Sequence, residues 1–238
     1  MNPPSASLRP MHVLLAVQSL VVVLVSVNRL SALTLSYVAP NQFLRWVDLI
    51  NMLPLPLLSL AAFYLLRKQL EVDGPAREGS RHRLLSLTFV VGVYLLGAGY
   101  GAHEVTNYLH ARFCADGAGD LCRIVAFNDD EFSHWLFFTG FVLVNVALLL
   151  IQDLFPAQQP PGRADSLLLV ANGFFIGLGV FANLAFEAIG LDLYIVALLA
   201  LFSAALCWRR GRQPLTIYYL TAYSLGLVGT LLYRALAS

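Results

Sequence analysis

Charged residues are scarce in this sequence, and their scarcity excludes an ordinary soluble domain. Only 12% of the 238 residues are Asp, Glu, Lys or Arg, while 58% are hydrophobic; soluble domains have about 25% charged residues. The formal net charge of +1 also leaves no basic excess of the kind that nucleic-acid-binding proteins carry. The composition therefore predicts a membrane protein, and nucleic acid is not an expected partner.

The hydrophobic residues are concentrated in seven runs, each close to or above the roughly 20 residues with which a helix crosses a bilayer. Segments such as 20–25 and 142–151 are apolar at nearly every position, whereas transmembrane strands alternate apolar and polar residues. We therefore predict an all-α, polytopic integral membrane protein, with one seven-transmembrane helix bundle over residues 1–238. Its helices are expected near 11–34, 44–66, 84–110, 131–151, 166–188, 191–208 and 216–236.

Two absences separate the chain from known classes of seven-helix protein. A rhodopsin holds retinal on a lysine within a helix, but the only lysine here, Lys68, lies between the second and third runs. The seven-helix hydrolases related to alkaline ceramidases and adiponectin receptors carry a His-x-x-x-His pair in their last helix. The run 216–236 contains no histidine. The number of predicted spans is the same as in both classes. However, the absence of a lysine within a helix excludes retinal binding as in a rhodopsin, and the histidine motif of the hydrolases is missing.

Basic residues in the loops predict the orientation, because short cytoplasmic loops are enriched in Lys and Arg. Ten of the 15 basic residues fall on the side of the N-terminus and the other five on the opposite side. We therefore expect a plasma-membrane protein with a cytoplasmic N-terminus and an extracytoplasmic C-terminus.

Two of the three cysteines lie in a predicted outer loop. Cys114 and Cys122 flank a turn-rich stretch with two glycines, and an oxidising compartment favours a disulfide between them. Two free thiols are the alternative.

Polar residues gather at the outer ends of four of the predicted helices. Ionisable side chains at membrane depth are costly, so such a group indicates a functional site by default. Arg, Trp and Tyr residues that anchor helices at the interface, Arg45 among them, are set aside. The remaining candidates predict a shared cavity that opens to the outer side, and they are Asp48, Asn51, His103, Glu104, Asn107, His110, Asp130, Glu131, His134, Asn183 and Glu187.

Histidines and carboxylates in this group are the ligands that catalytic zinc takes, with three protein ligands and one position for water. A divalent metal is therefore the expected cofactor, zinc rather than iron, because a di-iron site needs two Glu-x-x-His motifs and the chain has one. Asp129 is assigned to the N-cap of the fourth helix. The expected metal ligands are His103, His134, Asp130 and Glu187. The expected catalytic residues are Glu104 and Glu131, and the residues expected at the substrate or behind the ligands are Asp48, Asn51, Asn107, His110 and Asn183.

The function expected from this pattern is that of an intramembrane metal-dependent enzyme. Its partners are membrane lipids, and its hydrolase-like reaction acts on a lipid or other amphiphile from the outer leaflet. The alternative is a proton-coupled transporter or channel, because chains of histidines and carboxylates relay protons. A membrane sensor or assembly partner is a third possibility. The absence of an internal repeat and the few polar residues in the cytoplasmic halves disfavour a carrier.

Overall fold

The computed structural model describes residues 7–72, 79–115, 117, 119–187 and 191–237. Over these residues the chain is helical apart from its loops and one isolated β-bridge. Seven helical segments within them are long and apolar enough to cross a membrane, which fits the predicted all-helical, multi-pass membrane protein. The elements, with π-helices marked η, are α1 (Arg9–Leu30), α2 (Trp46–Met52), α3 (Pro54–Val72), α4 (Ser80–Phe113), α5 (Asp120–Ala126), η1 (Phe127–Phe132), α6 (Ser133–Leu154), α7 (Arg163–Ala182), η2 (Asn183–Glu187), α8 (Asp192–Arg210) and α9 (Pro214–Ala237).

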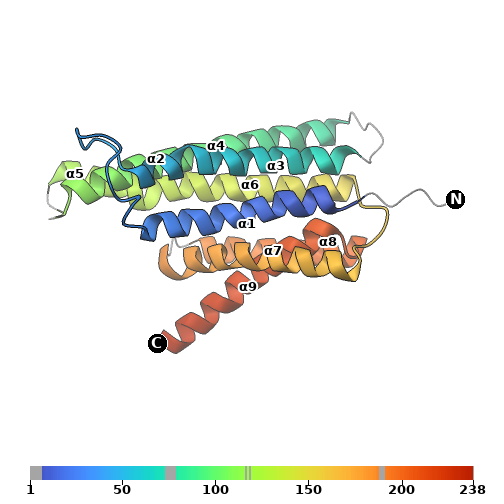
Figure 1. Ribbon diagram of the computed structural model, residues 1–238. Coiled ribbons are helices and arrows are strands. Elements are labelled where there is room, and N and C mark those ends of the chain that lie inside the picture. Colours follow the sequence, from blue (N-terminus) through green and yellow to red (C-terminus); the bar gives the residue numbers. More distant parts are fainter. Residues whose placement is uncertain (1–6, 73–78, 116, 118, 188–190, 238) are drawn as a thin grey trace.

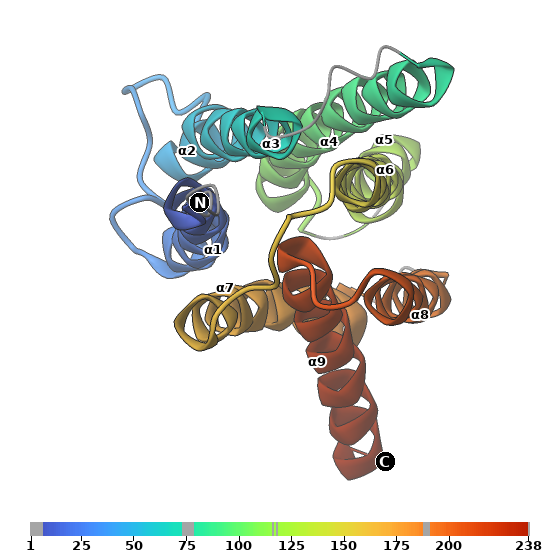
Figure 2. The same cartoon turned by 90° about the vertical axis from the view of Figure 1, so that its right-hand side faces the viewer.

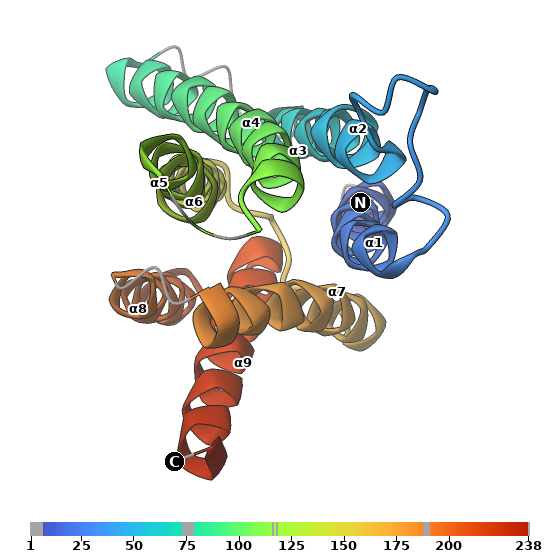
Figure 3. The same ribbon diagram turned by 90° about the vertical axis from the view of Figure 1, so that its left-hand side faces the viewer.

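Most of the long helices run side by side along one direction, while α9 crosses them obliquely (Figure 1). Figures 2 and 3 view the bundle from its two ends. Helix α4 packs along α6, α9 packs against α7 and α8, and α1 joins the two groups through α3 and α7. We call the end at which α1 begins the N-terminal end. The opposite end, which holds α5 and the loop 31–45, is called the α5 end.

The second membrane-spanning segment is divided near its start. Helix α2 ends at Met52, and α3 begins at Pro54, whose ring nitrogen has no hydrogen to donate to a helical hydrogen bond. The short α2 packs against α1 and α4, and both Asp48 and Asn51 are buried there. The break therefore positions two polar side chains inside the α5 end.

Glycines bring α4 and α6 into close contact. A Cβ atom added at Gly99 would lie 2.5 Å from the backbone nitrogen of Phe137, and one at Gly92 would lie 2.9 Å from that of Val144. Neither position leaves room for a methyl group, so small residues allow the two backbones to approach. This approach sets the separation between the polar groups that the two helices carry at the α5 end.

The fourth membrane-spanning segment begins earlier than the sequence pattern predicts. The helix starts at Asp120 and continues through η1 into α6, so residues 129–131 lie inside a continuous helix and the predicted N-cap at Asp129 is wrong. Cys114 and Cys122 form the predicted disulfide, with a Cα–Cα distance of 5.4 Å. The disulfide ties the end of α4 to the first turn of α5.

The N-terminal end, which the predicted orientation makes cytoplasmic, holds buried charge, although few polar residues were expected in those helix halves. His12 Nε2 lies 2.8 Å from Asp165 Oδ1, and His82 Nε2 lies 2.9 Å from an oxygen of Glu71. Asp153 is buried there as well. The partners lie on different helices, so the sequence pattern of a single helix does not reveal these pairs.

We expect Gly99→Ala to destabilise the protein by about 1–3 kcal/mol, because the new methyl group would overlap the backbone of α6. The matched control is Gly101→Ala on the same helix, where an added Cβ meets nothing within 4 Å. That substitution should leave stability unchanged or raise it by about 1 kcal/mol through helix propensity. Thermal unfolding of the two detergent-purified variants measures the difference, and equal melting temperatures would contradict the close contact.

Candidate functional site

A buried aspartate is the centre of a polar cluster between α4 and η1. Asp129 is 2% exposed. One carboxylate oxygen lies 3.0 Å from His110 Nδ1, and the other lies 3.1 Å from His103 Nδ1 and 3.3 Å from the Thr106 hydroxyl. His103, Thr106 and His110 follow one another at intervals of three and four residues and therefore share one face of α4. A single carboxylate thus contacts two imidazole rings and forms a hydrogen bond with that of His110.

The cluster continues from α4 to the first turn of α6. The ring of His134 lies beside that of His103, with 4.9 Å between the centroids and 57° between the planes. His110, Asp129, His103 and His134 therefore form a continuous row of contacts, which we call the His–Asp row. Its four members come from α4, η1 and α6. The sequence predicted both His103 and His134 as site residues, and the structure brings them together.

The π-helical turn η1 determines which of its three acidic residues enters the row. A π-helix widens one turn of a helix and often occurs at functional sites. Here Asp129 is buried, while the side chain of Asp130 is 62% exposed and Glu131 is exposed. Among the described residues, Glu131 has no hydrogen bond or ion pair to the row. The catalytic role that the sequence assigns to Glu131 therefore has no support in these contacts.

Asp130 lies beside a different histidine from the ones expected. Its carboxylate is 4.0 Å from His110 Nδ1, and its predicted partners were His103 and His134. Within the described residues, His110, Asp129 and Asp130 each offer a ligand atom, and the three atoms lie within 4.8 Å of one another. The reason is the early start of the helix, which turns Asp130 toward the outside of the bundle.

Glu187 was also predicted as a metal ligand. It is the last residue of η2, and its side chain lies outside the described residues. Its assignment as a ligand remains a prediction.

A second group of ion pairs lies between α1, α2 and α4. Glu104 is 1% exposed and forms an ion pair with Arg29. Arg45 donates hydrogen bonds to both oxygens of Asp48, at 2.8 and 2.7 Å, and lies 3.4 Å from Asn107 Oδ1. The hydrogen bonds to Asp48 raise the pKa of the Arg45 guanidinium above its usual value. Arg45 is therefore part of the buried network, which corrects its assignment as an interface anchor.

The three predicted asparagines have separate positions. Asn51 accepts a hydrogen bond of 2.7 Å from the side chain of Asn28 on α1, and Asn107 contacts Arg45. Asn183 donates to Asp192 at 3.4 Å, close to the start of α8. The polar residues expected in one shared cavity thus divide into the His–Asp row, the group around the two arginines, and the Asn183–Asp192 contact.

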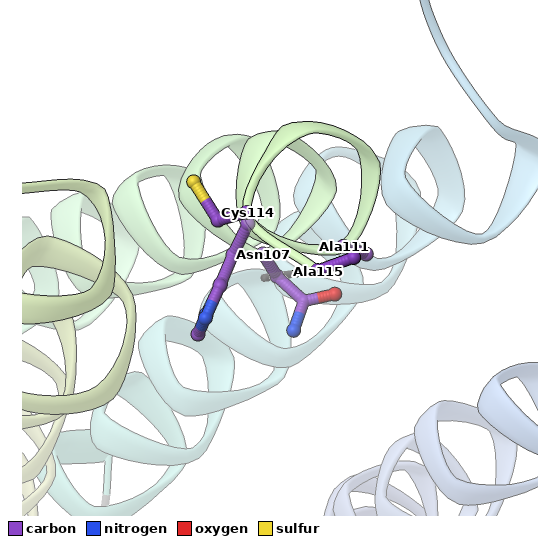
Figure 4. A pocket seen from close by; sticks show the side chains of 5 residues that line it. Asn107, Ala111, Cys114 and Ala115 are labelled. Carbon is purple, nitrogen blue, oxygen red and sulfur yellow. The ribbon is translucent and has the colours of Figure 1, made fainter. Parts of the chain in front are cut away.

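A shallow hollow of about 340 Å³ lies beside the His110 end of the row (Figure 4). It is lined by Asn107, His110, Ala111, Cys114 and Ala115. His110 therefore faces a hollow on one side and Asp129 on the other. The hollow therefore exposes the His110 end of the His–Asp row at the surface of the α5 end.

Two residues at the centre of the site were not among the sequence candidates. Asp129 was assigned to a helix cap, although the apolar residues Leu121 and Ile124, spaced three apart, indicate a helix that starts earlier. Arg29 has no such local signal, because its partner Glu104 is 75 residues away.

No protein-family model matches this chain, and neither a curated protein nor a solved structure matches it.

We expect Arg29→Gln to destabilise the protein by about 3 kcal/mol, because it leaves the buried Glu104 carboxylate without its cation. Adding Glu104→Gln should recover most of the loss, since two amides carry no uncompensated charge. Arg234→Gln is the control at the same end, where the guanidinium donates to the backbone carbonyl of Leu184. Thermal unfolding of the three variants, the double included, tests the pair. If the double variant is no more stable than Arg29→Gln, the ion pair does not neutralise Glu104.

Proposed function

We propose that this chain is an intramembrane metalloenzyme whose divalent cation is bound by His103 and His134. The observation that carries the proposal is the 4.9 Å separation of their rings. Two imidazoles that bind one tetrahedral zinc ion through nitrogens at about 2.0–2.1 Å place their ring centroids about 5 Å apart. The two rings are therefore spaced as ligands of one ion.

Asp129 supports the assignment of His103 as a metal ligand. Its contact with His103 Nδ1 leaves Nε2 as the nitrogen available to a cation. Histidine ligands of metals almost always donate their other N–H to a carboxylate, a carbonyl or water, which fixes the tautomer and the direction of the ring. Asp129 also forms a hydrogen bond with His110 Nδ1, which extends its contacts toward the hollow.

The third protein ligand is assigned to Glu187 from the sequence. Two histidines and one glutamate are a known ligand set of catalytic zinc, with water at the fourth position. Zinc is the preferred ion, and non-haem iron is the alternative, because two histidines and a carboxylate also bind Fe(II).

The proposed reaction is hydrolysis of an ester or amide in a lipid or similar amphiphile. A bound zinc ion supplies acidified water and polarises the carbonyl group. Apolar side chains that face outward next to the row, Val105, Phe127 and Trp135, support a substrate that arrives from the lipid. We assign Glu104 a structural role, because it forms an ion pair with Arg29; its predicted catalytic role is not part of this proposal.

The proposed orientation puts the α5 end on the extracytoplasmic side. The excess of loop arginines on the other side supports it, and so does the disulfide between Cys114 and Cys122, because disulfides persist in oxidising compartments. The substrate then enters from the outer leaflet of the plasma membrane.

A proton-coupled carrier is the second candidate, because the His–Asp row is also a path along which a proton can move. The buried Tyr219 hydroxyl donates a 2.8 Å hydrogen bond to Asn145 nearer the N-terminal end. Asn145 follows His134 by 11 residues on α6, or about 16 Å, and the buried side chains between them include Phe138 and Val144. This apolar interval interrupts the path and favours a site with one opening.

The metal proposal predicts that His103→Gln and His134→Gln each abolish metal retention. His12→Gln is the matched control, because His12 contacts an aspartate in the same way at the opposite end of the bundle. Asp129→Asn should weaken metal binding by roughly 10- to 100-fold. Elemental analysis of the detergent-purified variants measures the effect and identifies zinc or iron. Equal metal content in the wild type, His12→Gln and the two ligand variants would overturn the proposal.

Activity is tested on the same samples. Zinc-loaded protein and protein treated with a chelator are incubated with a mixture of membrane lipids, and mass spectrometry detects released fatty acids and the lipids from which they were cleaved. We expect product only from metal-loaded wild type and the His12→Gln control. A bound metal without any hydrolysis product would retain the metal site and reject the hydrolase.

The orientation predicts opposite labelling of two introduced cysteines. In a Cys207→Ala background the remaining cysteines form the disulfide. Asn41→Cys, in the loop at the α5 end, should react with an impermeant maleimide on intact cells. Gln159→Cys, exposed at the N-terminal end, should react only after the cells are opened. The reverse pattern would place the His–Asp row on the cytoplasmic side.

A further inference from the structure

Three arginines surround one buried carboxylate at the N-terminal end. Asp153 lies in the last turn of α6, and its side chain is 2% exposed. Its Oδ1 atom is 2.7 Å from Arg209 Nη2 and 2.8 Å from Arg210 Nε, and its Oδ2 atom is 3.4 Å from Arg81 Nη2. Arg209 and Arg210 end α8, and Arg81 is the second residue of α4. We call Arg81, Arg209 and Arg210 the arginine cluster.

The arginine cluster carries more positive charge than its carboxylate neutralises. Asp153 is the only carboxylate of the described chain within 4.0 Å of these three guanidinium groups, which leaves a local excess of two positive charges. Each guanidinium has five N–H donors, and one carboxylate accepts only a few of them. The arginine side chains are about half exposed, so the donors that Asp153 does not use face outward.

Apolar surface adjoins these charges on both helices that supply them. Trp208, next to Arg209, is 92% exposed, and tryptophan concentrates at the level of lipid headgroups. Leu201 lies two turns back along α8, and Leu84 lies one turn beyond Arg81 on α4; both are exposed. Seen from the N-terminal end, α6 lies between α4 and α8 (Figure 2). Positive charge at the headgroup level is therefore bordered by surfaces that acyl chains would contact.

We propose that the arginine cluster binds the phosphate group of an anionic phospholipid. Guanidinium groups match the oxygens of a phosphate through paired hydrogen bonds, and basic sites between membrane helices bind anionic headgroups. Asp153 holds the three guanidinium groups in place while their remaining donors stay available. The exposed leucines and Trp208 favour a lipid over free phosphate, because a soluble ion gains nothing from an apolar border. The proposal is independent of the metal site and of the orientation in the membrane.

Lipid titration of the delipidated full chain in detergent, followed by native mass spectrometry, tests the proposal. We expect phosphatidylglycerol to bind at least about tenfold more tightly than phosphatidylcholine, since each nearby arginine contributes appreciably to binding of an anionic lipid. Arg209→Gln/Arg210→Gln should remove that preference. The matched control is Arg83→Gln/Arg163→Gln, which removes the same charge from exposed residues at the same end and should keep the preference.

Each alternative result has a defined meaning. Equal loss in the two double variants would overturn the proposal in favour of general surface charge, and so would equal binding of the two lipids in the wild type. If glycerol phosphate or inorganic phosphate competes with phosphatidylglycerol at equal concentration, the ligand is soluble phosphate and the lipid assignment is wrong. If Arg209→Gln/Arg210→Gln fails to fold, Arg81→Gln is compared with Arg83→Gln on the same helix. Only Arg81→Gln should weaken phosphatidylglycerol binding, by about fivefold.

Discussion

The contact between α4 and α6 is the interaction on which the polar α5 end depends. Glycines at the contact allow the two backbones to approach closely, and the π-helical turn η1 then directs Asp129 toward the histidines of α4. Without this approach, lipid or other side chains would separate His103 on α4 from His134 on α6. The glycines have no reactive side chains, but they set the distances between the polar groups of α4 and α6.

The same electrostatic constraint shapes both ends of the bundle. A charge buried in an apolar medium is costly unless it is paired, and Glu104, Asp48 and Asp153 each have arginine partners. Asp129 differs, because it is shared by two histidines, whose charge depends on protonation or on a bound cation. Asp153 has the opposite imbalance, because the three positive charges of its arginine partners exceed its single negative charge. These two unbalanced places are where external ligands are proposed: a cation near the His–Asp row and an anionic headgroup at the arginine cluster.

Several site residues were recognisable from local pattern alone. His103 and His134 stand out as ionisable groups near the ends of apolar runs, and Cys114 and Cys122 flank a short turn. Asp129 was missed because three adjacent acidic residues look like a helix start, and the π-turn that buries only one of them depends on packing. Arg29 and the arginines around Asp153 were missed because their partners are distant in sequence. Local periodicity contains no information about which helices become neighbours.

The sequence by itself determined that this is an all-helical, multi-pass membrane protein, because hydrophobic runs of this length have few other ways to satisfy their backbone hydrogen bonds in lipid. It also identified His103 and His134 as ionisable residues near the ends of apolar runs. Only the tertiary structure decided which polar groups meet, because that depends on the separation of α4 and α6 and on the turn geometry of η1. Pairing across helices is a property of packed surfaces, and small displacements along or around a helix axis change every partner.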